Sequence, residues 1–298
     1  MFSVEVLNQV EKIWEEGGNI AQFLRKLEQN VYNSKEAILI SYEYQSGTYV
    51  DGYKKNPKNI NTYAKQLSDE LKLLGGFKTI LECGVGEATT FKQVIGNLDI
   101  PLKNSYGFDI SWSRLKVGMD FLKENIKNNP NFFVADFSSI PLCDNSIDVV
   151  YTSHSIEPNG GNEKLILEEL YRITKNYLVL FEPDYELASD EAKIRMESHG
   201  YAIHIASTAK MLGYNIIKRK LLEYSINPLN PTSVIVIEKS SNSYKKESDD
   251  IFQCPITKTK LIDYGEIYFA PQSHIMYPVI RNIPCLLKTQ AIFGFKYL

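Results

Sequence analysis

Between residues 79 and 182 the sequence alternates short apolar runs with amphipathic segments, and this alternation constrains the fold more than any other feature. Strands that are apolar on both faces and separated by helices form a parallel sheet covered by helices on each side. The sequence therefore predicts an α/β fold for this region. We expect strands at 79–83, 105–109, 131–135, 147–153 and 177–182, and helices at 89–96, 113–126 and 163–174.

The flanking segments predict additional parts on either side of this core. Residues 1–60 contain two short amphipathic helices and a tyrosine-rich stretch, which predict a helical cap or lid. The alternative is that the tyrosines only pack the helices onto the body. Residues 61–239 form the main domain, with further helices at 61–74 and 190–199 and two sheet-edge strands at 215–222 and 233–238. The polar residues 240–250 read as a linker, and 251–298 as a small β-rich domain.

Composition restricts the class of protein. The chain has 298 residues, 44% of them hydrophobic, so it can bury a sizeable core as a soluble globular protein. Its 33 Lys and Arg against 36 Asp and Glu give a net charge of −3, which argues against a general nucleic-acid binder. The acidic first residues and the lack of a long apolar run indicate a cytoplasmic protein without a membrane span. A homodimer is compatible with the sequence. The four cysteines form no C-x-x-C pair and read as reduced thiols.

The first predicted strand ends in an acid followed by two glycines, Glu82-Cys83-Gly84-Val85-Gly86, just before a helix begins. Glycines at such a turn let backbone N–H groups approach a ligand closely, and a helix N-terminus favours negative charge. The third glycine of a dinucleotide-binding G-x-G-x-x-G motif would fall on Thr89. The segment therefore predicts a nucleotide-type pocket other than a nicotinamide site.

Three further strands also end in polar residues. The second ends at Asp109, 25 residues after Gly84, where α/β folds bind ribose hydroxyls. The third runs into Asp136, and the fourth into the segment 153–157, Ser-His-Ser-Ile-Glu. Because parallel strands end at one edge of the sheet, we expect these groups to line a single crevice.

Taken together, these motifs resemble the class I S-adenosylmethionine-dependent methyltransferases, especially the small-molecule, type 11-like branch, over about residues 63–239. The resemblance implies a Rossmann-like seven-stranded sheet, with S-adenosylmethionine as cofactor. It also implies that Asp109 binds the ribose and that Asp136 and Phe137 meet the adenine. One departure is Ala88, where many members have a third glycine. The cofactor-binding residues that the resemblance implies are Glu82, Gly84 and Gly86 at the methionine end, and Asp109, Ile110, Asp136, Phe137, Ser153 and, from the N-terminal segment, Tyr49.

The acceptor side is predicted at the end of the fourth strand. His154 follows this strand near the expected methyl position, and its ordinary pKa of about 6.5 suits removal of a proton from a hydroxyl nucleophile. Glu157 would orient it or contact the substrate. The alternative, of equal weight, is that His154 and Glu157 only hold the loop or cap the next helix.

The C-terminal segment resembles the small activator subunit shared by several tRNA, rRNA and release-factor methyltransferases. That family reads roughly C-P-x-C, then Y/F-P and I-P-x-L-L. Here Thr257 stands at the second cysteine, leaving Cys254, Cys285 and His274 as candidate ligands, too few for zinc. We therefore expect no metal. A fused copy would dock onto its own catalytic domain or present substrate.

These features favour a methyltransferase acting on a small polar metabolite, such as a sugar or a natural-product intermediate. The activator-like tail keeps open an enzyme acting on RNA or a translation factor. A catalytically silent cofactor-binding scaffold is the third hypothesis, and the intact acids Glu82, Asp109 and Asp136 count against it.

Overall fold

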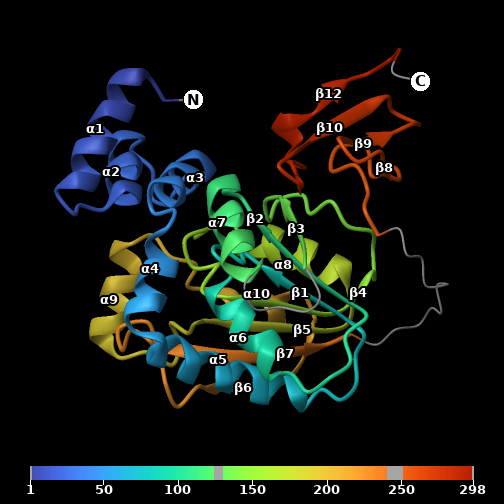
Figure 1. Ribbon diagram of the computed structural model, residues 1–298. Coiled ribbons are helices and arrows are strands. Elements are labelled where there is room, and N and C mark those ends of the chain that lie inside the picture. The colour runs from blue at the N-terminus through green and yellow to red at the C-terminus, as the bar shows by residue number, and fades with distance from the viewer. Residues whose placement is uncertain (1, 124–129, 240–250, 297–298) are drawn as a thin grey trace.

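The computed structural model describes residues 2–123, 130–239 and 251–296. It consists of an N-terminal group of helices, a central sheet covered by helices on both faces, and a small C-terminal β module (Figure 1). The predicted linker, 240–250, lies outside the described residues, as does the end of the helix expected at 113–126.

The central sheet has seven strands in the order β3-β2-β1-β4-β5-β7-β6. The first five strands are parallel, and β7 is antiparallel to both β5 and β6. Of the two late strands, β7 therefore lies inside the sheet, and β6 forms the edge opposite β3. The prediction that both late strands are edge strands is therefore wrong for β7. The strands are β1 (Thr79–Cys83), β2 (Asn104–Asp109), β3 (Asn131–Val134), β4 (Ile147–Ser153), β5 (Thr174–Pro183), β6 (Asn215–Leu221) and β7 (Thr232–Glu238).

Helices bury both faces of this sheet, as the strands that are apolar on both sides require. One buried cluster packs α5 against β1 and β4 through Leu67, Leu71 and Val149, and another packs α8 and α10 on the opposite face. These helices are α5 (Pro57–Lys72), α6 (Thr89–Asn97), α7 (Trp112–Lys123), α8 (Glu163–Ile173), α9 (Asp190–Ser198) and α10 (Ile205–Met211). The predicted domain start at residue 61 falls inside α5.

The tyrosine-rich N-terminal stretch is helical, which its weak periodicity did not reveal. It contains α3 (Lys35–Tyr44) and α4 (Thr48–Lys55), which follow α1 (Val4–Glu15) and α2 (Ile20–Leu27). Ser34 caps α3 by accepting a hydrogen bond from the Ala37 N–H. The first three helices share a small core, and α3 and α4 both contact α7 at the sheet edge.

The C-terminal module is a second, antiparallel sheet in the order β11-β10-β9-β8, with β12 paired to β10. Its strands are β8 (Ile262–Asp263), β9 (Ile267–Ala270), β10 (Ile275–Ile280), β11 (Ile283–Pro284) and β12 (Ile292–Phe293), and a short 3₁₀ helix, η1 (Lys288–Gln290), precedes β12.

This module docks onto the edge strand β3 of the same chain. Val134 and Cys285 form a parallel bridge, and the Leu286 N–H donates to the Val134 carbonyl at 3.0 Å. Leu286 and Tyr277 belong to the same buried cluster as the strands of the central sheet. An open sheet edge exposes unpaired backbone groups, and the module covers part of this one.

None of the helices in the described part of the chain combines the length and the apolarity needed to span a bilayer.

Candidate active site

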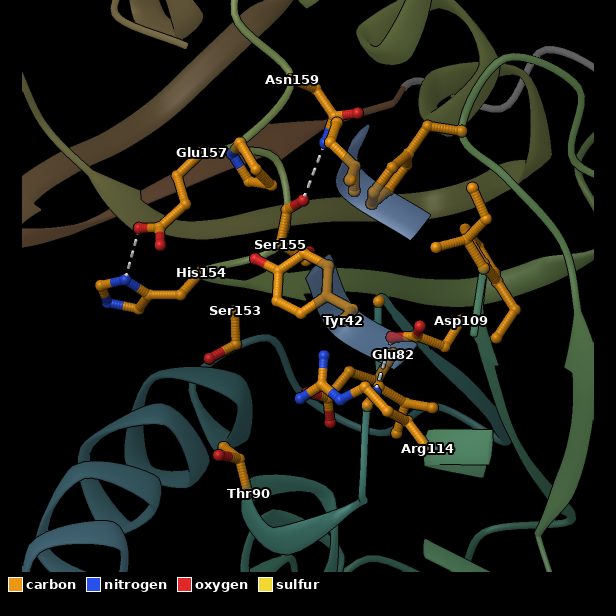
Figure 2. A pocket seen from close by; sticks show the side chains of 18 of the residues that line it. Tyr42, Glu82, Thr90, Asp109, Arg114, Ser153, His154, Ser155, Glu157 and Asn159 are labelled. Carbon is orange, nitrogen blue, oxygen red and sulfur yellow. Dashed lines mark hydrogen bonds and ion pairs between the residues drawn. The ribbon is translucent and has the colours of Figure 1, made fainter. Parts of the chain in front are cut away.

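The carboxyl ends of β1, β2, β3 and β4 meet at one cavity of about 470 Å³, whose wall also includes Tyr42 of α3 and Tyr49 of α4. Figure 2 shows several of the residues that line it. The structure brings all eleven predicted site residues to its wall. They are Tyr49, Glu82, Gly84, Gly86, Asp109, Ile110, Asp136, Phe137, Ser153, His154 and Glu157.

The glycine turn after β1 has the backbone conformation that only glycine adopts without strain. Gly84 has φ of 75°, and a Cβ there would lie 2.3 Å from the Ser155 Cβ. Gly86 has φ of 54°, and a Cβ there would meet the Arg114 guanidinium at 2.5 Å. Ala88, which stands in for the family's third glycine, is also left-handed, with φ of 58° at the start of α6. Both glycines are therefore required, because neighbouring side chains occupy the space that a Cβ would need.

Asp109 is fixed by the loop it faces. Its carboxylate accepts the Gly86 N–H and the Ser111 N–H, both at 2.9 Å. Each carboxylate oxygen has a second lone pair, so Asp109 can still accept hydrogen bonds from the two hydroxyls of a ribose.

Glu82 lies deeper, at the end of β1, and is 2% exposed. The Tyr151 hydroxyl donates to it at 2.5 Å. Burial raises the pKa of Glu82 to about 8, with Asp109 adding to the rise and the Tyr151 hydrogen bond opposing it. Glu82 is therefore mostly protonated at neutral pH in the protein alone.

The third acid, Asp136, follows β3. It accepts the Ser138 N–H at 2.7 Å and lies 3.1 Å from the Lys35 ammonium of α3. The neighbouring Phe137 ring packs edge-on against Phe108, at a centroid distance of 5.4 Å. An acid beside an aromatic ring and the apolar Ile110 suits a purine with an exocyclic amine.

His154 has φ of 52° and both ring nitrogens engaged. Nδ1 is 2.9 Å from Glu157, and Nε2 is 2.7 Å from the Thr232 hydroxyl. Burial acts to lower the pKa of His154, but the Glu157 carboxylate outweighs it and the pKa is raised. Because neither nitrogen is free, the geometry favours a positioning role over that of a general base.

A second buried acid, Glu182 at the end of β5, supports this loop by accepting the Ser155 and Ile156 N–H groups at 3.1 and 3.2 Å. Burial raises the pKa of Glu182 to about 7.

Tyr42, Glu87 and Arg114 are among the residues of the cavity wall that were not anticipated from the sequence. Glu87 ties the N-terminal helices to the glycine turn, because its carboxylate accepts the Gly47 N–H at 2.9 Å and the Val50 N–H at 2.7 Å. The sequence did offer a signal for Glu87, because an acid between the glycine turn and the start of α6 lies close to the N-terminus of that helix. Nothing in the sequence placed Tyr42 or Arg114 at the site.

The candidate zinc ligands of the C-terminal module lie apart. Cys254 contacts the Tyr277 hydroxyl at 3.3 Å, whereas Cys285 lies at the junction with β3 and His274 lies against Phe295. Within the described ranges, no three His, Cys, Asp or Glu side chains form a group that could hold a metal ion.

Comparison with known proteins agrees with this architecture. Residues 81–180 match a family model described as a methyltransferase domain. Magnesium protoporphyrin IX methyltransferase (ChlM) from Synechocystis PCC 6803, with bound SAH, is 15% identical and aligns over 70% of this chain and 100% of its own, with a TM-score of 0.52. A chain from the complex between the Haloferax volcanii Trm112 methyltransferase activator and the putative methyltransferase is 13% identical. It aligns over 66% of this chain and 96% of its own, with a TM-score of 0.50. No curated protein matches the chain.

Proposed function

The chain contains a class I S-adenosylmethionine-dependent methyltransferase domain, and we propose that it transfers the methyl group to a small polar metabolite. The observation that carries the proposal is the size and enclosure of the cavity. Its volume of about 470 Å³ must hold both the cofactor and the reacting part of the acceptor. Pockets for one ligand alone commonly measure about 300–1,000 Å³, so the remaining space suits a small acceptor.

The residues present fit the cofactor. Gly84 and Gly86 line the cavity, Asp109 retains lone pairs for two hydroxyls, and Asp136 with Phe137 suits an adenine. S-adenosylmethionine, when bound, supplies an activated methyl group, and the protein's task is to position the acceptor and exclude water.

Polar groups at the end of β4 and beside β7 form the acceptor side. Glu157 is held by His154 at 2.9 Å and by the Asn230 amide at 3.4 Å, and the Ser153 hydroxyl lies 3.1 Å from the Tyr63 hydroxyl. These hydrogen-bonding groups of the protein suit a substrate whose nucleophile is a hydroxyl or an amine. We propose that His154 orients Glu157, and that Glu157 contacts the acceptor.

Closure by the N-terminal helices supports the exclusion of water. The two backbone bonds of Glu87 and the Lys35–Asp136 ion pair join these helices to the sheet edge. A small acceptor enters such a covered site more readily than a folded macromolecule does.

The test is a methyl-transfer assay with radiolabelled S-adenosylmethionine on a cell extract separated into small molecules, RNA and protein. We expect label in the small-molecule fraction, and calorimetry should show binding of S-adenosylhomocysteine. Label found only in the RNA or protein fraction would refute the proposal that the methyl acceptor is a small metabolite. Binding without transfer to any fraction would instead favour the scaffold.

A second candidate, methylation of RNA or a translation factor, is favoured by the aromatic surface of the C-terminal module. Phe293 and Phe295 are 71% and 69% exposed and stack at a centroid distance of 5.8 Å. Exposed rings can stack on unpaired bases. An electrophoretic shift with total RNA at physiological salt tests this candidate, because tight and salt-sensitive binding would favour it.

A further inference from the structure

Arg114, in the first turn of α7, places a buried guanidinium in the cavity without an acceptor for its charge. The residue is 7% exposed, and its Nε has no hydrogen-bond partner among the described residues. In those same ranges, the only carboxylate oxygen within 4 Å of its nitrogens is one from Glu87, 3.9 Å from Nε. A buried cation without a hydrogen-bonded counter-charge is unfavourable, so a partner is expected from outside the chain.

The neighbouring carboxylates are already engaged elsewhere. The two oxygens of Glu87 accept the Gly47 and Val50 N–H groups at the start of α4. The two oxygens of Asp109 accept the Gly86 and Ser111 N–H groups. Their negative charge still acts through space. It outweighs the effect of burial and raises the pKa of Arg114, so the guanidinium is charged.

The other basic side chains of the cavity wall have partners. Lys35 pairs with Asp136 at 3.1 Å, and His154 pairs with Glu157 at 2.9 Å. Among the described lining residues, Arg114 is therefore the one cationic side chain left to bind an anionic group.

The guanidinium is also held in one orientation. The rings of Tyr42 and Tyr49 lie 4.8 and 4.5 Å from its central carbon. Figure 2 shows it pointing toward the space between Thr90 and Ser153, below the ring of Tyr42. Thr90 is in the first turn of α6, whose N-terminus also favours negative charge.

We propose that Arg114 binds the carboxylate of the cofactor's methionine moiety, as a two-pronged donor whose guanidinium lies against the rings of Tyr42 and Tyr49. The proposal rests on the proposed function, because it assumes that the cofactor's methionine end lies beside Gly86. A guanidinium presents paired N–H groups that match a carboxylate, which an ammonium does not. Arg114 is thus a cofactor-positioning residue, and its contacts with Tyr42 and Tyr49 of the N-terminal helices restrict its movement.

The experiment is calorimetry with two probes, S-adenosylhomocysteine and its decarboxylated analogue, which lacks only the carboxylate. Each is titrated into the full-length chain and into Arg114→Met, Arg114→Lys and Lys123→Met. Lys123 is a matched control, because it removes one positive charge from the same helix where the side chain is exposed and pairs with Asp120. Thermal unfolding checks that each variant is folded.

We expect the unaltered chain and Lys123→Met to bind S-adenosylhomocysteine about ten- to a hundredfold more tightly than the analogue, the range for a hydrogen bond between charged groups. Arg114→Met should lose this preference while keeping its affinity for the analogue within about threefold, and Arg114→Lys should keep part of it. An unaltered chain that binds both probes equally refutes the inference without any variant. A preference retained in Arg114→Met also refutes it, and failure to bind either probe refutes the proposed function itself.

Discussion

We expect Glu82 to couple cofactor binding to the release of a proton, and this coupling is the sharpest prediction of the site. In the protein alone, burial holds the pKa of Glu82 at about 8. We expect the methionine moiety, whose amino group is cationic, to bind beside the ionised form. Binding should therefore require Glu82 to release its proton, and affinity should rise as the pH approaches 8.

The expected size follows from that pKa. At pH 7 only about one-tenth of Glu82 is ionised, so binding should release about 0.9 proton. Between about pH 6.5 and 8 the ionised fraction rises from roughly 3% to one-half, which corresponds to about a sixteenfold gain in affinity, or roughly 1.6 kcal/mol.

The assay is calorimetry with S-adenosylhomocysteine across this pH range, in two buffers of different ionisation enthalpy so that released protons are counted. Glu82→Gln is the control, and it is needed because Glu182, with a pKa of about 7, titrates in the same range. We expect the glutamine variant to bind more weakly and to lose the slope. A flat profile in the unaltered chain, or an unchanged slope in Glu82→Gln, would refute the reasoning.

Three further predictions address the other parts of the molecule. Asp109→Ala should weaken S-adenosylhomocysteine binding by about 1–3 kcal/mol in calorimetry, because hydrogen bonds to the ribose and within the loop are lost, whereas Asp120→Ala, on the solvent-facing side of α7, should not. His154→Ala should lower turnover about tenfold or more while cofactor affinity changes less than about threefold; equal loss of both would indicate a structural role. Ile283→Ala, at a fully buried position beside β3, should lower the free energy of urea unfolding by about 2–5 kcal/mol, and exposed Phe293→Ala by less than about 0.5. Equal effects would show that the module does not pack on the sheet.

The sheet was predictable because its strands are apolar on both faces. The bounds predicted for β1 and β4 match the structure, and most other elements differ at their ends by a few residues. The helices α3 and α4 were missed because little of their surface is buried in an apolar core. In α4 only Val50 is buried, and Tyr42 of α3 faces the cavity. A helix that lines a polar site loses the apolar stripe by which it is recognised.

The acids of the site were predictable from one rule, that parallel strands end at the same edge. Arg114 was not, because its role depends on a cavity formed by three separate segments: the glycine turn, α7 and the lid tyrosines. The docking of the C-terminal module was equally hidden, since Val134 and Cys285 are 151 positions apart, 285 − 134. Contacts between residues so far apart in the chain leave no local pattern in the sequence.

The contact between β3 and the C-terminal module has a consequence for the enzyme in dilute solution. Both surfaces belong to one polypeptide, so their encounter is governed by an effective concentration that dilution does not change. Specific activity should accordingly stay constant as the protein is diluted, and each catalytic centre carries its own copy of the module in a fixed one-to-one ratio.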